Sequence, residues 1–321
     1  MKYLRPILLI LLATFALAAQ VKSGIPDPID VLANPDSSQL FGTSLTTVFT
    51  KLDFPALDIG CGSEGDVCAV GINKKLYCYD LVQNKWDLIQ GNEEISDIVA
   101  VDVDDEGKIY IIATCGIYYL DCTDKWVRLP GTGKDIGVGA NFDVWKIGSD
   151  QENSKNLNFG VWKLFCECDC NCICIRICIR FRKLSFNICD PVSKRRCHWF
   201  RAGVYGVAID VFPNGDAAVV KDNGTVHIAD GVTFEISAVP GRLPQKAVDI
   251  TVGNNGVMYV TIANGEIYKY NFTTKTWTKV TQATIPAFRI CASAYDIPWY
   301  TKLDSTDANK FILTAAIHDY I

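Results

Sequence analysis

The sequence is poor in the residues that carry most enzyme chemistry. Its 321 residues include 3 His and 2 Met. Neither a Gly-x-Ser-x-Gly elbow nor a His-Glu-x-x-His motif occurs. Since His198, His227 and His318 lie in unrelated settings, we predict no catalytic residue and no enzymatic activity.

A basic stripe and long apolar runs are also missing. The 36 Asp and Glu outnumber the 31 Lys and Arg, which gives a formal net charge of −5. A dedicated nucleic-acid binder normally carries a basic face, so we predict no nucleic-acid partner. No segment after residue 18 is long and apolar enough to span a membrane. Sustained helical periodicity is absent as well, which favours an all-β fold.

Residues 1–18 have the pattern of a secretory signal peptide. Lys2 and Arg5 precede a short apolar run, and Ala16 and Ala18 occupy the small-residue cleavage positions. We therefore predict that the protein is secreted and extracellular, where cysteines are normally oxidised. Asn223 and Asn271 each begin an Asn-x-Thr sequon and are glycosylation candidates, although both sequons also suit turns.

A short phrase recurs along the chain with a period of about forty residues. It contains an apolar run with Asp, a spacer, Gly and a short apolar strand, and it occurs at 56–65, 99–107, 207–215 and 247–256, with degenerate copies at 135–143 and 288–296. An aromatic residue stands near the end of each unit: Phe49, Trp86, Trp126, Trp199, Phe234 and Trp277. Four strands per unit are typical of a propeller blade, and we predict six blades over 45–321. The N-terminal strand would close the ring, whereas an open solenoid would leave exposed sheet edges.

The units resemble tectonin repeats, a β-propeller family that includes the tachylectins and fish-egg lectins. The fifth unit carries the resemblance best, with Asp249-Ile250-Thr251-Val252-Gly253 leading to Gly256 and Tyr259, followed by Gly265-Glu266-Ile267-Tyr268 and Trp277. The resemblance implies a secreted carbohydrate-binding lectin of innate defence. Its partners would be microbial or cell-surface glycans, including lipopolysaccharide. Six similar sites on one ring would make such binding multivalent.

Tryptophans near the blade ends are the candidate sugar contacts. An aromatic face can cover the apolar side of a pyranose ring. On this argument the ligand-binding candidates are Trp86, Trp126, Trp199 and Trp277. The alternative is that these side chains pack between neighbouring blades.

A cysteine-rich insertion interrupts the third unit, at about residues 149–180. Cysteines alternate from Cys166 to Cys174, and Cys178, Cys189 and Cys197 follow. Cysteines two apart on one strand are poorly placed to bond each other, so they need partners on other segments or chains. Three interpretations remain open: disulfides, a thiolate metal cluster, and a coding artefact in which this segment is not part of the true protein. Intermolecular disulfides would favour self-association, and then the alternative function of a structural protein of an extracellular coat.

Three further cysteine pairs are disulfide candidates. Cys68 and Cys78 flank a hairpin turn, and the other pairs are Cys115 with Cys122 and Cys61 with Cys291, the last across the ring closure.

Four aspartates recur at what we take to be one position of the repeat: Asp58, Asp102, Asp210 and Asp249. At one position they could face a shared axis and hold calcium, as in some propeller hydrolases. Their recurrence favours a structural role, in which each carboxylate accepts hydrogen bonds from its own turn. We therefore name no metal ligand and leave calcium open.

Overall fold

The computed structural model describes residues 48–51, 54–62, 65–81, 83–89, 95–121, 124–140, 143–148, 159–167, 177–180, 183–186, 196–280, 287–293, 296–303 and 311–317. The chain divides into two units, 1–46 and 47–321, and all of these residues belong to the second. The predicted signal peptide at 1–18 and Cys122 lie outside them. Within these ranges no helix has the length and hydrophobicity needed to cross a membrane.

The strands form six four-stranded antiparallel sheets, which we number as blades 1 to 6. Blade 1 contains β2 (Ala56–Cys61), β3 (Val67–Gly71), β4 (Leu76–Asp80) and β5 (Lys85–Leu88). Blade 2 contains β6 (Ile98–Val103), β7 (Ile109–Ala113), β8 (Gly116–Leu120) and β9 (Trp126–Leu129). Blade 3 contains β10 (Asp135–Val138), β11 (Val144–Gly148), β12 (Gly160–Glu167) and β15 (Arg196–Tyr205).

The remaining blades complete the set. Blade 4 contains β16 (Ala208–Val211), β17 (Ala217–Val220), β18 (Val226–Ala229) and β19 (Ile236–Ala238). Blade 5 contains β20 (Ala247–Val252), β21 (Met258–Ile262), β22 (Ile267–Asn271) and β23 (Thr276–Lys279). Blade 6 joins the last three strands, β24 (Ala287–Ser293), β25 (Ile297–Leu303) and β26 (Phe311–Ile317), to the first, β1 (Val48–Lys51).

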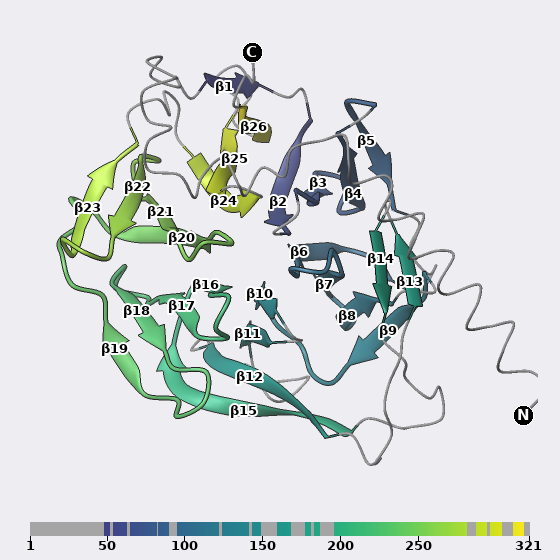
Figure 1. Cartoon of the computed structure of the whole chain (residues 1–321), viewed down its shortest axis with the longest axis horizontal. Helices are drawn as coiled ribbons and strands as arrows, with labels where there is room; N and C mark the ends of the chain where they lie inside the picture. Colours follow the sequence, from purple (N-terminus) through teal and green to yellow (C-terminus); the bar gives the residue numbers. More distant parts are fainter. Residues whose placement is uncertain are drawn as a thin grey trace, which may run out of the picture. The chain divides into compact units, whose positions relative to one another are not determined.

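The first strand of each of blades 1 to 5, and β24 of blade 6, is the inner strand. Each inner strand contacts the next one, in the order β2, β6, β10, β16, β20, β24 and back to β2. Figure 1 shows these strands pointing toward a common centre. The prediction of an all-β propeller is therefore confirmed, and the N-terminal strand does pair with the last one, from Val48 opposite Ile317 to Lys51 opposite Thr314.

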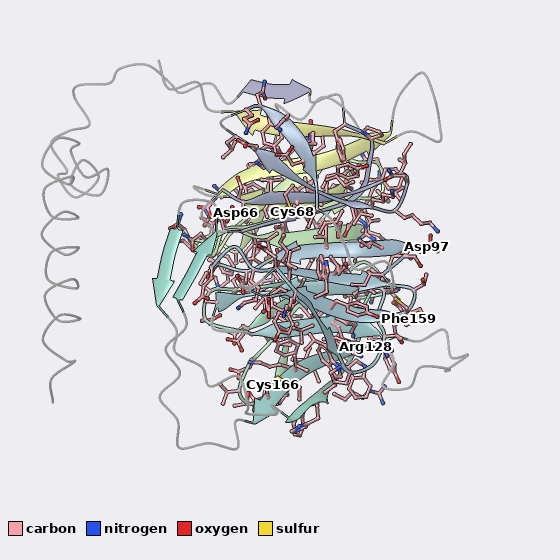
Figure 2. The ribbon with its side chains drawn as sticks, turned by 90° about the vertical axis from the view of Figure 1, so that its right-hand side faces the viewer. Asp66, Cys68, Asp97, Arg128, Phe159 and Cys166 are labelled. Carbon is pink, nitrogen blue, oxygen red and sulfur yellow. A yellow bond between two sulfur atoms is a disulfide. The ribbon has the colours of Figure 1, made fainter. Side chains whose placement is uncertain are left out.

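The ring has two faces. We call the face where the inner strands begin the start face, and the face where they finish the end face. In the side view of Figure 2, Asp66, which follows β2, lies on the end face, and Asp97, which precedes β6, lies on the start face. The six inner strands together line a channel between the faces.

Sharp turns and apolar contacts between blades hold the sheets in place. In blade 5, Gly256 and Gly265 adopt φ values of 73° and 82° at the two hairpin turns, where an L-residue would be strained. The largest apolar cluster then packs Ala218 and Val220 of blade 4 against Ile250 and Val260 of blade 5. Each blade thus buries its apolar face against its neighbour rather than within its own sheet.

Blade 3 accommodates the extra length between its two outer strands. β12 pairs directly with β15, and Cys166 and Cys197 form a disulfide across this pair with a Cα–Cα distance of 4.0 Å. β12 takes residues 160–167 of the predicted 149–180 insertion into the blade as a strand. Between β12 and β15 in sequence, β13 (Ile177–Arg180) pairs with β14 (Lys183–Phe186).

Candidate functional site

Two residues of each inner strand face the next blade, and they define two levels of the channel. In the order of blades 1 to 6, and with the first-level residue named first, the pairs are Asp58 and Gly60, Ala100 and Asp102, Asp135 and Gly137, Ala208 and Asp210, Asp249 and Thr251, and Arg289 and Cys291. Odd-numbered blades thus place Asp at the first level, and blades 2 and 4 place it at the second. Blade 6 has Arg and Cys instead.

This arrangement corrects the prediction that Asp58, Asp102, Asp210 and Asp249 share one repeat position. Strand register places Asp58 opposite Val70, whereas Asp102 lies opposite Tyr110, two residues further along its strand. Asp102 and Asp210 do accept the amide of the residue that follows each of them. The contacts are not confined to a local turn, because each of the four carboxylates also reaches the next blade.

At the first level, each Asp clamps the following inner strand. The accepting Oδ2 atoms lie 2.9 Å from Val101 N for Asp58, 3.0 Å from Ile209 N for Asp135 and 2.8 Å from Ile290 N for Asp249. A backbone amide at the edge of a sheet would otherwise lack a partner in the narrow channel, so these bonds join the blades as well as satisfy the amides.

At the second level, Asp102 and Asp210 do the same for the following blade. Asp102 Oδ2 accepts from Val138 N at 2.7 Å, and Asp210 Oδ2 accepts from Val252 N at 2.7 Å. The opposing position must be small: a Cβ on Gly60 would lie 2.5 Å from the Asp102 Cα. The channel is therefore tight at this level, where backbone meets backbone.

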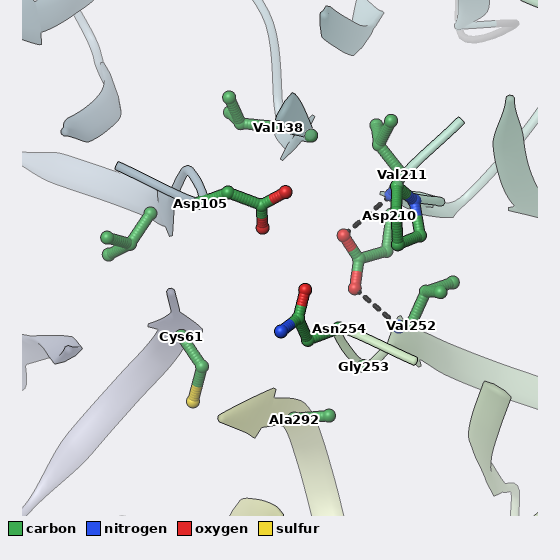
Figure 3. Close-up of a pocket in the computed structure, with 12 residues that line it drawn as sticks. Cys61, Asp105, Val138, Asp210, Val211, Val252, Gly253, Asn254 and Ala292 are labelled. Atoms are coloured by element: carbon green, nitrogen blue, oxygen red, sulfur yellow. Dashed lines mark hydrogen bonds between the residues drawn. The ribbon is translucent and has the colours of Figure 1, made fainter. Parts of the chain in front are cut away.

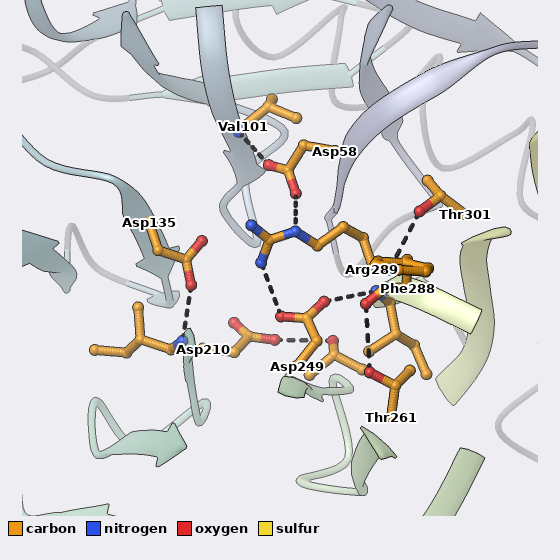
Figure 4. Close-up of polar contacts among 12 residues, drawn as sticks. Asp58, Val101, Asp135, Asp210, Asp249, Thr261, Phe288, Arg289 and Thr301 are labelled. Carbon is orange, nitrogen blue, oxygen red and sulfur yellow. Dashed lines mark hydrogen bonds and ion pairs between the residues drawn. The ribbon is translucent and has the colours of Figure 1, made fainter. Parts of the chain in front are cut away.

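The junction between blades 6 and 1 is different. Cys291 takes the second-level place of the carboxylate and bonds covalently to Cys61, with a Cα–Cα distance of 5.5 Å. At the first level, Arg289 Nε lies 3.5 Å from Asp58 Oδ1, and Arg289 Nη1 lies 3.3 Å from Asp249 Oδ1. Figure 4 shows the guanidinium between these two carboxylates, with Asp135 facing it across the channel.

Burial dominates the electrostatics of this group. It raises the pKa of Asp58 and raises the pKa of Asp135 well above its ordinary value, while the nearby Arg289 partly opposes both shifts. Burial also raises the pKa of Asp249 to about 6 and that of Asp210 to about 7. Although burial alone lowers the pKa of Arg289, the surrounding carboxylates raise it overall, so the side chain remains a cation.

The start-face mouth of the channel is wide. Two adjoining hollows, with volumes of ≈ 350 and ≈ 480 Å³, share Val207 and Arg289 in their linings. The first also includes Val248 and Phe288, and the second includes Val99 and Lys134. Together they have the size of a small-molecule site, and Arg289 is reached from both.

The end-face mouth is smaller and more polar. Its volume is ≈ 20 Å³, and its lining includes Asp105, Asp210 and Asn254. Figure 3 shows the side chains of Asp105 and Asn254 projecting into it. Asp210 uses both carboxylate oxygens on backbone amides, those of Val211 and Val252, which leaves little capacity for a ligand.

The channel does not fit a calcium site. Among the residues that the structure describes, no group of three or more His, Cys, Asp or Glu is placed to hold a metal ion. The aspartates are split between two levels and spend oxygen atoms on backbone amides. A guanidinium lies between two of them. We derive no chemistry through a metal.

The four predicted sugar-contacting tryptophans lie far from the channel, on the outermost strands β5, β9, β15 and β23. Each is partly buried in a cluster between blades. Trp86 stacks on Phe54 with ring centroids 4.4 Å apart, and Trp199 donates its indole N–H to Pro130 O at 2.7 Å. The structure therefore gives Trp86, Trp126, Trp199 and Trp277 packing roles.

Two predicted cysteine pairs are formed as disulfides, Cys68–Cys78 and Cys61–Cys291. For the third pair, Cys115 is exposed and its Sγ accepts a hydrogen bond from the Tyr118 hydroxyl, while Cys122 lies outside the described residues. Asn223 lies on an exposed turn and Asn271 is the exposed last residue of β22; their side chains accept hydrogen bonds from the backbone amides of Thr225 and Thr273.

Sequence analysis missed two residues of the channel, Arg289 and Asp135. A signal for Arg289 exists: it precedes Asp296 by seven residues, the same spacing that separates Asp249 from Gly256 in the previous unit. Arg289 thus stands where an odd blade would carry Asp. Asp135 belongs to a degenerate unit, and its partner turn lacks the expected Gly.

Comparisons with known proteins show which solved structures share this fold. No protein-family model matches the chain, and no curated protein matches its sequence. A gluconolactonase from Xanthomonas campestris superposes with a TM-score of 0.56 at 9% identity, covering 84% of this chain and 89% of that one. A second structure assigned to the gluconolactonases gives 0.53 at 10%, covering 88% and 96%. Virginiamycin B lyase from Staphylococcus aureus gives 0.50 at 13%, covering 85% and 100%.

These similarities overturn the tectonin interpretation. The structures that the chain resembles are named as enzymes and not as tectonin lectins. The predictions of a tectonin-repeat lectin of innate immunity and of a protein without enzymatic activity were therefore wrong. The physical reason is that short Gly, Asp and Trp repeats describe how a blade turns and packs, which several propeller families share. At 9–13% identity the likeness shows the fold, a β-propeller, and no more.

Proposed function

We propose that the chain is an enzyme that hydrolyses a small ester or lactone at the start-face mouth of a six-bladed ring. The observation that carries the proposal is the group formed by Arg289 and the first-level carboxyls. It places a fixed cation in the lining of a hollow large enough for a small molecule, and the Asp135 carboxyl, whose pKa burial raises, faces that cation from within the channel.

Arg289 supplies the positive charge. Asp58 and Asp249 hold its Nε and Nη1 atoms, and in the described residues Nη2 has no acceptor. Its side chain is 30% exposed, and the residue lines both hollows. A preorganised N–H donor of this kind stabilises the negative charge that develops on a carbonyl oxygen when water attacks.

Asp135 supplies the base. Its Oδ2 accepts from Ile209 N, while its Oδ1 is left without a hydrogen bond or ion pair in the described part of the chain. Asp58 and Asp249 instead give their Oδ1 atoms to Arg289. Asp135 can therefore take a proton from a water molecule as the water oxygen attacks the carbonyl carbon. It returns this proton to the leaving alkoxide when the C–O bond breaks.

The comparisons and the disulfides support the setting of this reaction. One of the similar structures is named a gluconolactonase, and a second is assigned to the gluconolactonases; the name specifies a lactone as substrate. We bring that reaction class to this chain as part of the proposal. Three disulfides join described strands, which supports a secreted protein in an oxidising compartment.

The test is a hydrolysis assay over a panel of lactones and aryl esters, in which the acid released by the reaction is measured. We expect turnover in the wild-type protein and a loss of at least about a hundredfold in kcat for Asp135→Asn. Asn keeps an acceptor for Ile209 N, so the fold should survive. Asp87→Asn, on the exposed β5, is the matched control.

The pH profile tests the role of Asp135 separately. The carboxylate form is the base, so kcat/KM should rise with pH through its raised pKa and then level off. No turnover of any panel member by folded wild-type protein would overturn the proposal. So would an Asp135→Asn variant that keeps its activity.

A further inference from the structure

A collar of six residues borders the start-face mouth. Each residue immediately precedes the first-level residue of its blade, and the set is Leu57, Val99, Lys134, Val207, Val248 and Phe288. Five members are apolar and one is a lysine. The collar thus places a largely apolar rim around the polar group formed by Arg289 and its carboxylates.

Strand geometry turns these side chains toward the mouth. In four blades the pairing register shifts at the collar residue, between Ala56 and Asp58, Ile98 and Ala100, Ala247 and Asp249, and Ala287 and Ile290. A bulge of this kind leaves the extra residue unpaired and re-aims its side chain. Bulges repeated in the same place around a ring indicate a designed feature of the mouth.

The apolar members of the collar remain open to solvent. Val99 is 38% exposed, Val248 39% and Phe288 49%. These three, with Val207, line the two hollows beside Arg289. Exposed apolar side chains that converge on one hollow are typical of a ligand site, whereas scattered ones are ordinary surface.

Lys134 is the polar exception. It is half-buried, and its Nζ lies 4.5 Å from the centroid of the Phe159 ring. Within the described ranges it forms no ion pair. Burial lowers its pKa, and although nearby Asp135 and Asp222 oppose this shift, the proximity of Arg289 adds to it. Two cations that face one hollow repel each other, and an anionic or strongly polarised oxygen between them would relieve the repulsion.

We propose that the site takes lactones or esters with an apolar body, such as alkyl-substituted lactones, in preference to hydroxyl-rich sugar lactones. This inference rests on the proposed function and adds the substrate class. The carbonyl oxygen would face Arg289 and Lys134, and the alkyl chain would lie against Val99, Val248 and Phe288. A sugar lactone would place its hydroxyls against these three side chains, which offer no hydrogen-bond partner.

The decisive experiment separates binding from catalysis. Decanoate, the carboxylate of a ten-carbon chain, is titrated into the Asp135→Asn variant by calorimetry, with gluconate as the polar comparison. We expect decanoate to bind at least about tenfold more tightly than gluconate. In parallel, the wild-type protein is assayed with δ-decanolactone and with glucono-δ-lactone.

Each outcome bears on one of the two proposals. Selective decanoate binding without turnover of any lactone would support the apolar substrate class as a ligand class and overturn the hydrolase proposal. Turnover of glucono-δ-lactone with equal or better kcat/KM than δ-decanolactone would keep the hydrolase and overturn the apolar class. Neither binding nor turnover would overturn both.

Matched variants test whether the collar determines the selectivity. Phe288→Ser should weaken decanoate binding about tenfold, because an apolar contact is lost, and Phe272→Ser should not, although Phe272 is 46% exposed on another turn. Lys134→Met should weaken the binding of decanoate more than the binding of decanol. Lys269→Met is its control, since Lys269 also lies over an aromatic ring, that of Tyr259. Equal effects in variant and control would overturn the collar as the binding surface.

Discussion

Five of the blade junctions and the sixth are held by different chemistry. At each of the five, an Asp on one inner strand accepts an amide hydrogen of the next, as Asp102 does from Val138. At the sixth, Cys291 bonds to Cys61 and Arg289 contacts Asp58. The five join blades that follow one another in the chain, whereas the disulfide joins residues 230 apart in sequence.

The difference shows where the ring needs extra stabilisation. Bringing distant segments together costs more chain entropy than joining successive blades. A covalent bond restricts the unfolded chain most when the loop it closes is long. The sixth junction also concentrates the reactive groups, since Arg289 serves both as a clamp and as the cation of the proposed site.

Removing the sixth-junction disulfide should have the largest effect. The Cys61→Ser, Cys291→Ser double variant should lose about 4–5 kcal/mol of unfolding free energy, because its loop is long. The Cys68→Ser, Cys78→Ser variant removes a loop with a sequence separation of 10 and should lose about 2–3 kcal/mol. Chemical denaturation under non-reducing conditions measures both. Equal losses would contradict the closure role.

Replacing Arg289 should have the second-largest effect on stability. Arg289→Met leaves Asp58 and Asp249, whose side chains are 8% exposed, without their counter-ion, at a cost of about 3 kcal/mol at pH 8. The deficit should shrink as the pH falls and the carboxyls take up protons. Thermal melts from pH 4 to pH 8 would show this, and adding Asp249→Asn should restore part of the loss. A deficit that does not change with pH would argue that packing, and not charge, holds this junction.

A change at one of the five hydrogen-bonded junctions should be smaller. Gly60→Ala places a Cβ 2.5 Å from the Asp102 Cα, which forces blades 1 and 2 apart at a cost of about 2 kcal/mol. Gly256→Ala is the control, because it has a positive φ but no atom within 4 Å of the added Cβ. Its cost reports backbone strain alone. If the two variants had the same melting temperature, the close approach of the two blades would not limit stability.

The smallest effect is a slope in stability with pH. Asp210 and Asp249 have pKa values raised to about 7 and about 6 by burial, above the ordinary pKa of 3.8 that they have in an unfolded chain. Between these values the folded protein binds more protons, so stability should fall as the pH rises from about 4 to about 7. Asp210→Asn should flatten the slope near pH 7, and Asp222→Asn, on an exposed turn, should not. A wild-type stability that increases over this range would contradict the raised values.

Much of the fold could be predicted from the repeat itself. The recurring phrase marks the inner strands, and the aromatic residues mark the outer ones, so Phe49 predicted the ring closure that β1 makes. The disulfide between Cys61 and Cys291 also followed from closure. These features depend on local pattern and on the order of units, which the sequence carries directly.

The channel was harder to predict because it depends on register. The spacing from Asp to the turn Gly is seven residues for Asp58 and Asp249 and five for Asp102 and Asp210. A difference of two keeps a side chain on the same face of a strand but moves it one level along the channel. The role of Arg289 depends on Asp58, which lies in another unit, and only closure of the ring brings the two residues together.

The alternation of the two levels sets the symmetry of the channel. By its strand count the ring repeats every blade, yet from blade 1 to blade 5 its carboxylates alternate between the two levels, with Asp58, Asp135 and Asp249 on alternate blades. The polar interior therefore follows a two-blade repeat, which only blade 6 breaks. An ancestral or redesigned version of this channel would be duplicated in units of about eighty residues. A unit of forty would place every carboxylate at one level, where like charges meet.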